Sequence, residues 1–168
     1  MSAPDRRRER APPVARRLRD IAVLGWPIAV LISIEFLLGM ALNLFTALPS
    51  AGGPIAILSA SPVLIGHFVV AFLILGVLSR ATALSIRLGH PRAIGTSVLG
   101  LGSGVVATLA GLAFAFGGQA PAASYLMSIG FVGVLFTAVG LLAIGWSSES
   151  DPPRRPSEPG AASSGSPP

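Results

Sequence analysis

The sequence predicts an all-α fold, a transmembrane four-helix bundle, and three observations lead to this class. Apolar residues make up 52% of the 168 residues and charged residues only 11%, whereas soluble domains carry about 25% charged residues. Four apolar segments are each about 20 residues long or longer, which is enough to cross the ~30 Å hydrocarbon layer of a bilayer. All twelve basic residues are arginines, and every one falls on the same side of the membrane that these segments define.

Prolines and glycines separate the four predicted spans. The spans cover residues 24–48, 62–82, 93–116 and 122–146. Pro62 suits the first turn of the second span, because proline needs no hydrogen-bond acceptor for a backbone N–H there. Together the spans form a transmembrane domain over 21–146. Residues 1–20 are basic and interrupted by prolines, and 147–168 are rich in serine, proline and glycine, so we expect both to be disordered cytoplasmic segments.

The positions of the arginines predict the orientation in the membrane. Seven precede the first span, three lie near the connection between the second and third spans, and two follow the fourth. The connections 49–61 and 117–121 carry no charge. Because cytoplasmic segments are enriched in basic residues, the N-terminus and C-terminus should both be cytoplasmic. We therefore expect a multi-pass protein of a bacterial cytoplasmic membrane.

Composition and motif content also restrict the function and the partners. The chain has no cysteine, which excludes disulfides and thiolate metal sites. It lacks a phosphate-binding loop, paired catalytic carboxylates and a metal-spaced cluster, so it favours a non-enzymatic protein and leaves an enzyme open. The arginines flank apolar spans, so we expect no nucleic-acid partner. The arginine-rich N-terminus should instead contact anionic lipid headgroups, at about 1 kcal/mol per residue.

Stripes of small residues predict where the helices pack. Gly100 and Gly104 lie at helical spacing in the third span, and Gly130 and Gly133 lie in the fourth. Helix association in lipid depends on close backbone approach, which small residues permit. We expect these glycines, together with Gly39 in the first span, to lie at helix–helix contacts.

One polar cluster is the candidate site. Glu35 lies near the middle of the first span and is the only acidic residue in any span, and Asn43 follows on the same helix face. A charged side chain at this depth costs ~2.5–3.5 kcal/mol, so Glu35 should face the bundle interior, find a partner or be protonated. If the first two spans form an antiparallel hairpin, His67 comes level with Gly39 and within reach of Glu35. Tyr125 and its neighbouring serines would complete a polar pocket open to the outside.

This cluster has a structural and a functional interpretation, and both remain open at this point. Interhelical hydrogen bonds in membranes contribute about 0.6 kcal/mol on average, so the cluster could hold the helices in register. Intramembrane ionisable residues also mark sites for protons, ligands or cofactors.

Three classes of function follow from these observations. The first is a non-enzymatic accessory protein that binds a membrane protein partner or forms a homo-oligomer, with no cofactor. The second is a haem-b or quinone redox protein. His67 and His90 are 23 residues apart, ~34 Å along a helix, so they cannot ligate one haem together, whereas His67 with Met40 or Met127 could. The third is a small proton-coupled transporter.

Two resemblances bear on these classes. A membrane-embedded glutamate in the first of four spans resembles the small multidrug resistance transporters, but the strong arginine bias argues against their antiparallel dimers. The pattern Glu35-Phe-Leu-Leu-Gly39-x-x-x-Asn43-Leu-Phe, followed by Gly-His67, resembles a group of small four-span bacterial membrane proteins of unassigned function. That resemblance covers residues 24–146 and implies a shared bundle, with no activity to carry over.

Overall fold

The computed structural model describes residues 13–46, 53–59, 61–117 and 119–149. These residues form helices and their connections, with no strand among them. Four of the helical stretches are long and apolar enough to cross a membrane. The all-α class is therefore confirmed, as are four apolar helices of membrane-spanning length. The predicted disorder of 1–12 and 150–168 falls outside the described residues, but 147–149, also expected to be disordered, belong to a helix that ends at Glu149.

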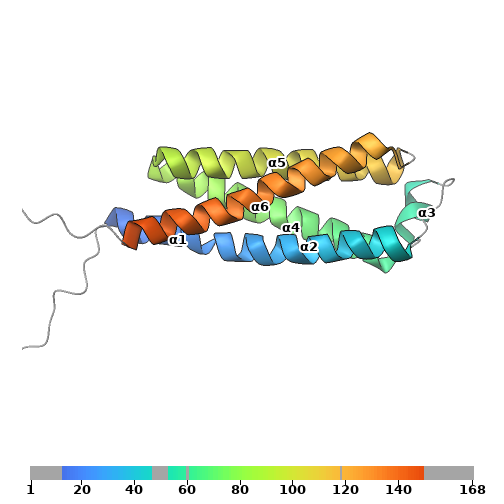
Figure 1. The fold of residues 1–168 in the computed structure, drawn as a ribbon, viewed down its shortest axis with the longest axis horizontal. Helices are drawn as coiled ribbons and strands as arrows, with labels where there is room; N and C mark the ends of the chain where they lie inside the picture. Colours follow the sequence, from blue (N-terminus) through green and yellow to red (C-terminus); the bar gives the residue numbers. More distant parts are fainter. Residues whose placement is uncertain (1–12, 47–52, 60, 118, 150–168) are drawn as a thin grey trace, which may run out of the picture.

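The helices run back and forth along one long axis (Figure 1). They are α1 (Pro13–Val23), α2 (Gly25–Phe45), α3 (Pro54–Ser59), α4 (Pro62–Leu88), α5 (Pro91–Phe116) and α6 (Pro121–Glu149). Helices α2 and α5 each pack against both α4 and α6, so the four long helices form a closed ring.

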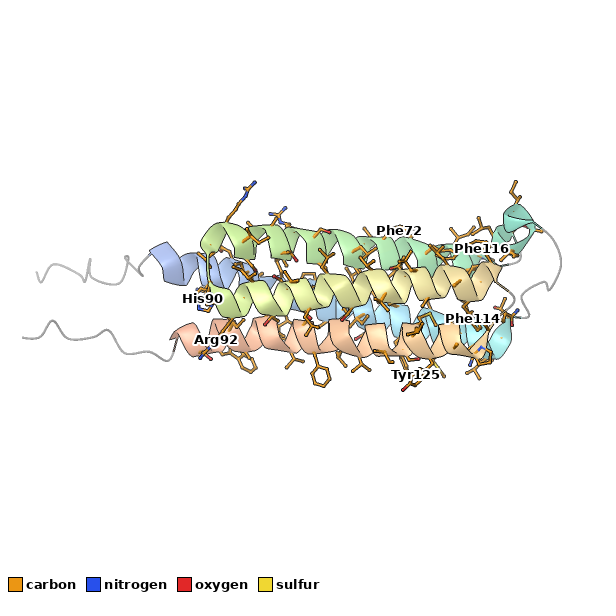
Figure 2. The ribbon with its side chains drawn as sticks, turned by 90° about the horizontal axis from the view of Figure 1, so that it is seen from above. Phe72, His90, Arg92, Phe114, Phe116 and Tyr125 are labelled. Carbon is orange, nitrogen blue, oxygen red and sulfur yellow. The ribbon has the colours of Figure 1, made fainter. Side chains whose placement is uncertain are left out.

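The two ends of the bundle differ in charge. One end holds α1, the connection between α4 and α5, and the last turns of α6, and we call it the arginine end (Figure 1). Figure 2 shows Arg92 and His90 there, at the start of α5. The opposite end, which we call the α3 end, holds α3 and the connection between α5 and α6. The described residues at the α3 end carry no charge.

Prolines and glycines that were predicted to separate the spans begin and end helices in the structure. Pro62 starts α4 directly after Ser61, whose hydroxyl accepts a hydrogen bond of 3.2 Å from the N–H of Val63. Gly89 ends α4 at a φ of +70°, a left-handed conformation that glycine adopts without steric cost. Pro91 then begins α5. These caps make the turn at the arginine end short, which holds α4 and α5 antiparallel.

The start of the first helix differs from the sequence prediction. Residues 13–20 were expected to be disordered, but they belong to α1. Leu18 and Ile21, three residues apart, are buried, and Ala22 packs against Gly145 of α6. An apolar stripe at helical spacing thus packs α1 along the end of α6.

Two further boundaries were missed. The second span continues to Leu88 rather than ending at residue 82, and its last turns carry buried Ser85 as well as Arg87. The short helix α3 was not predicted, although Pro54 stands at its first position, where proline favours a helix start. Between α1 and α2 the helix is interrupted at Leu24, because Pro27 has no N–H to bond the carbonyl of residue 23.

Glycines bring α5 and α6 into close contact. A Cβ atom at Gly130 would lie 2.6 Å from the backbone oxygen of Ser103, and one at Gly100 would lie 2.6 Å from Oγ1 of Thr137. At Gly133, the Ser103 side chain occupies the space that a Cβ atom would need. Gly104 faces α4 instead, where a Cβ would lie 3.0 Å from Leu78. Only glycine fits at such short backbone separations.

Hydrogen bonds between helices reinforce the half of the bundle nearer the arginine end. Thr137 of α6 donates to the carbonyl of Thr96 in α5 at 3.2 Å. Thr82 of α4 donates to the carbonyl of Ser97 in α5 at 3.1 Å. Both threonine side chains are buried, and each hydroxyl also bonds to a carbonyl one turn back in its own helix. This half is therefore tightly packed, which leaves the other half as the place for a cavity.

We predict that Gly130→Ala lowers the stability of the bundle by about 1–3 kcal/mol, because the new methyl group overlaps a backbone atom that cannot rotate away. Gly102→Ala is the matched control, since a Cβ at Gly102 of α5 meets no atom within 4 Å. Unfolding with a denaturing detergent measures both variants. Equal stability of the two would contradict the close α5–α6 packing.

Candidate functional site

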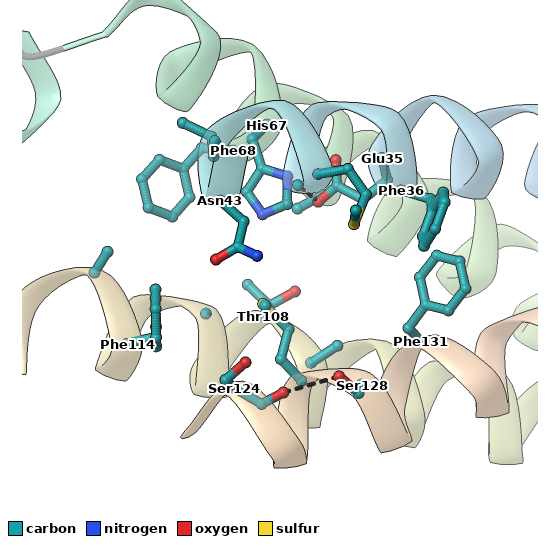
Figure 3. A pocket seen from close by; sticks show the side chains of 18 of the residues that line it. Glu35, Phe36, Asn43, His67, Phe68, Thr108, Phe114, Ser124, Ser128 and Phe131 are labelled. Atoms are coloured by element: carbon teal, nitrogen blue, oxygen red, sulfur yellow. Dashed lines mark hydrogen bonds and ion pairs between the residues drawn. The ribbon is translucent and has the colours of Figure 1, made fainter. Parts of the chain in front are cut away.

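A cavity of about 620 Å³ lies between the four long helices, in the half of the bundle toward the α3 end. Figure 3 shows side chains from α2 and α4 on one side of it and side chains from α5 and α6 on the other. Most of the wall is apolar. The polar residues that line it are Glu35, Asn43, Thr46, His67, Thr108, Gln119, Ser124 and Ser128.

Glu35 and His67 meet at the wall of this cavity. Nδ1 of His67 lies 3.2 Å from Oε1 of Glu35, and the two side chains are 16% and 12% exposed, respectively. The distance is that of an ion pair, but the contact does not have hydrogen-bond geometry. Among the described residues, neither Nδ1 of His67 nor Oε2 of Glu35 has a hydrogen-bond partner, although both atoms are buried. The pair is therefore close but incompletely satisfied.

Gly39 of α2 lies against the imidazole of His67. A Cβ atom at Gly39 would lie 3.6 Å from Cε1 of His67, in ordinary van der Waals contact. Gly39 is one turn from Glu35, and Asn43 is one turn further on the same face of α2. In Figure 3 the imidazole ring lies between the carboxylate of Glu35 and the amide of Asn43. The structure thus brings these predicted site residues together.

Two pairs of aromatic rings join neighbouring helices beside the cavity. Phe36 of α2 and Phe131 of α6 have ring centroids 5.7 Å apart, at an interplanar angle of 45°. Phe68 of α4 and Phe116 of α5 are stacked, with centroids 6.2 Å apart and an angle of 1°. Such pairs contribute roughly 0.5–1.5 kcal/mol beyond the area they bury. They hold α2 to α6 and α4 to α5 around the cavity.

Two hydroxyl groups of the lining donate their hydrogens to their own helices. Thr108 donates to the carbonyl of Gly104 at 2.9 Å, and Ser128 donates to the carbonyl of Ser124 at 3.0 Å. Their oxygens keep free acceptor capacity, as does the carboxylate of Glu35. The side-chain amides of Asn43 and Gln119 in the same lining can both donate and accept.

Tyr125 does not join the cluster, and its placement in the pocket was wrong. Its side chain is 69% exposed, is absent from the cavity lining and points away from the bundle in Figure 2. Ser124 lines the cavity, and the next residue along a helix is turned about 100° from it. Ser124 and Ser128 therefore line the cavity, whereas the side chain of Tyr125 points outward.

Sequence reasoning missed several cavity residues. Thr108 and Gly111 lie in the small-residue stripe of α5, which predicts packing along its whole length. At Gly111, however, a Cβ would meet only the sulfur of Met127 at 3.5 Å. Phe36 and Phe131 look like ordinary apolar positions, and nothing in a single sequence indicates that they pair.

No protein family, curated protein or solved structure matches the chain in the comparisons made. The resemblance to small four-span bacterial membrane proteins stays a prediction.

We predict that Gly39→Leu lowers the thermal stability of the bundle and displaces His67, because the added side chain needs the space of the imidazole. Gly39→Ala is the control, since a single Cβ fits at 3.6 Å. Unfolding midpoints in detergent compare the two variants. A Gly39→Leu protein as stable as the alanine variant would contradict the placement of His67 against Gly39.

Proposed function

We propose that the chain is a multi-pass protein of a bacterial cytoplasmic membrane, with both ends in the cytoplasm. Four membrane-length helices and the charge difference between the two ends of the bundle support this orientation. Arg80, Arg87 and Arg92 lie toward the arginine end, which the positive-inside rule assigns to the cytoplasm.

In this orientation Glu35 lies deep in the membrane. Trp26 is exposed near the arginine end, and indole rings favour the headgroup layer. Glu35 follows Trp26 by nine residues, ~13 Å along the helix, close to the middle of a ~30 Å hydrocarbon layer. His67 sits beside it.

We further propose that the protein is a non-enzymatic binding protein and that the cavity is its ligand site. The observation that carries this proposal is the incomplete pairing of Glu35 and His67 at the wall of a large cavity. A structural clasp satisfies its buried polar atoms, because each unpaired one costs about 1–3 kcal/mol. Here two buried atoms lack partners among the described residues, which supports a site that a ligand completes.

A second candidate is haem-b binding, which one observation favours. His67, Met40 and Met127 all line the same cavity. A histidine that turns Nδ1 toward a carboxylate, as His67 does toward Glu35, has the arrangement common in metal-ligating histidines. The absorbance spectrum of the purified protein separates the candidates, because bound haem gives a strong visible band and the non-haem binding protein is colourless.

The absence of cysteine allows a direct test of the orientation. We predict that Ser59→Cys, an exposed position in α3, reacts with a membrane-impermeant maleimide applied outside intact cells. Ser147→Cys, at the end of α6, should react only after the membrane is opened. The reverse labelling pattern would refute the proposed orientation.

The clasp and the ligand site predict opposite effects of replacing the pair. We predict that the double variant Glu35→Leu/His67→Leu keeps or raises the unfolding midpoint in lipid nanodiscs, because it removes two incompletely paired polar groups together and leaves neither one buried without the other. A lowered midpoint is the result expected of a clasp and would refute the ligand site. Thr137→Val is the comparison variant, and its midpoint should fall because it loses a buried interhelical hydrogen bond.

A further inference from the structure

The cavity is enclosed unevenly by its four helices. Its lining residues on α4 and α5 are all buried or half-buried in the described structure. Exposed lining residues occur on α2 and α6, besides Gln119 in the connection between α5 and α6. On the two helices they are Phe36, Met40, Asn43, Ser128 and Val132. The side opening of the cavity therefore lies between α2 and α6.

The tilt of α6 explains why the opening lies on this side. Near the arginine end α6 is in close contact with α2, where a Cβ at Gly25 would lie 2.9 Å from the carbonyl oxygen of Ala138. Toward the α3 end α6 lies alongside α5, to which Gly130 and Gly133 fasten it (Figure 1). The last contact between aromatic rings of α2 and α6 is that of Phe36 and Phe131, and the exposed lining residues Met40, Asn43 and Ser128 lie beyond it toward the α3 end.

This opening faces the bilayer if the helices span the membrane, so the inference rests on the proposed function. The outward surfaces beside the opening are apolar: Leu37 and Leu44 of α2 and Val132 of α6 are exposed. A molecule dissolved in the half of the membrane toward the α3 end can thus enter sideways, without passing through water.

The chemistry of the lining selects the polar end of such a molecule. The carboxylate of Glu35 has a buried oxygen without a partner, and the hydroxyls of Thr108 and Ser128 have already donated their hydrogens. The unpaired oxygen of Glu35 therefore needs a hydrogen-bond donor, which a ligand can supply. Nδ1 of His67 also lacks a partner. A hydroxyl group suits both residues, because its oxygen and hydrogen can accept and donate at the same time.

The apolar lining selects the rest of the molecule. Phe36, Phe68, Phe114 and Phe131 surround the polar cluster in Figure 3, with the flexible thioethers of Met40 and Met127 also in the lining. Aromatic side chains favour stacked or edge-on contacts with another ring, and methionine adapts to irregular apolar shapes. These residues fit a flat ring that carries the donor.

We propose that the cavity binds a membrane-dissolved phenolic amphiphile, a hydroxylated ring on an apolar chain, that enters between α2 and α6 and donates its hydroxyl hydrogen to Glu35. The ring lies among the phenylalanines, and the apolar chain extends through the opening into the lipid. The ligand thereby supplies a partner that the helices do not provide for the carboxylate.

The test compares two probes that differ in one hydrogen-bond donor, 4-dodecylphenol and its methyl ether. Binding to the full chain in lipid nanodiscs is measured as the excess over protein-free nanodiscs. We expect saturable binding of the phenol and at least about tenfold weaker binding of the ether, which cannot donate to a carboxylate. In Glu35→Leu the preference for the phenol should disappear. If this variant does not fold, Glu35→Gln should reduce the preference, because a neutral acceptor forms a weaker bond.

A pair of neighbouring substitutions tests the entry route. Ser128→Phe places a ring in the opening, and we expect it to weaken phenol binding at least about tenfold or to slow association to the same degree. Ile129→Phe places the same ring on the lipid-facing surface outside this cavity and should bind as the unchanged protein does.

Other outcomes overturn the inference in ways that leave the proposed function separately testable. Equal binding of phenol and ether, tighter binding of dodecyltrimethylammonium, or no saturable binding of either probe refutes the phenolic ligand. Equal effects of Ser128→Phe and Ile129→Phe refute the entry route. The proposed function itself fails only if the double variant Glu35→Leu/His67→Leu lowers the unfolding midpoint, which is measured without any probe.

Discussion

The scarcity of hydrogen-bond partners in a hydrocarbon environment governs the rest of this structure. A polar group there must be satisfied by the protein itself, since lipid offers neither donors nor acceptors. Most of the described hydroxyl groups follow this rule by bonding to a carbonyl one turn back in their own helix. Thr82 and Thr137 go further and also bond to the neighbouring helix. Among the buried side-chain polar atoms that the structure describes, those of Glu35 and His67 are the ones without a hydrogen-bond partner, and the cavity lies beside them.

The two halves of the bundle divide stability and binding between them. Near the arginine end, small residues and interhelical hydrogen bonds bring backbones together and leave fully buried side chains such as Ile28, Leu78 and Leu141. Toward the α3 end, large aromatic and thioether side chains keep the helices further apart around the cavity. A stable packed half allows the other half to keep incompletely paired groups, as binding sites in proteins commonly do.

The sequence was informative about spans and weak about helix rotation. Length and hydropathy are properties of single segments, so four spans could be predicted without knowing their neighbours. The approach of Glu35 to His67 could be anticipated as well, because pairing the first two spans as antiparallel neighbours limits which residues come level. The error at Tyr125 has the opposite cause. Periodicity shows which residues share a face, but which helix that face meets depends on all four rotations together. The polar pocket was predicted, but its extension along α5 was missed for the same reason, because a small-residue stripe has the same pattern beside a helix and beside a cavity.

The close fit at Gly25 gives α2 an unequal freedom along its length. At that position α2 touches α6 so closely that no side chain fits, whereas 18 residues further on Asn43 is exposed at the edge of the opening. The glycines of α6 also bring it into close contact with α5. Any swing of α2 then pivots near Gly25, and its far end travels the most. The width of the opening and the volume of the cavity would change together in such a motion, so a larger ligand would widen the opening through which it enters.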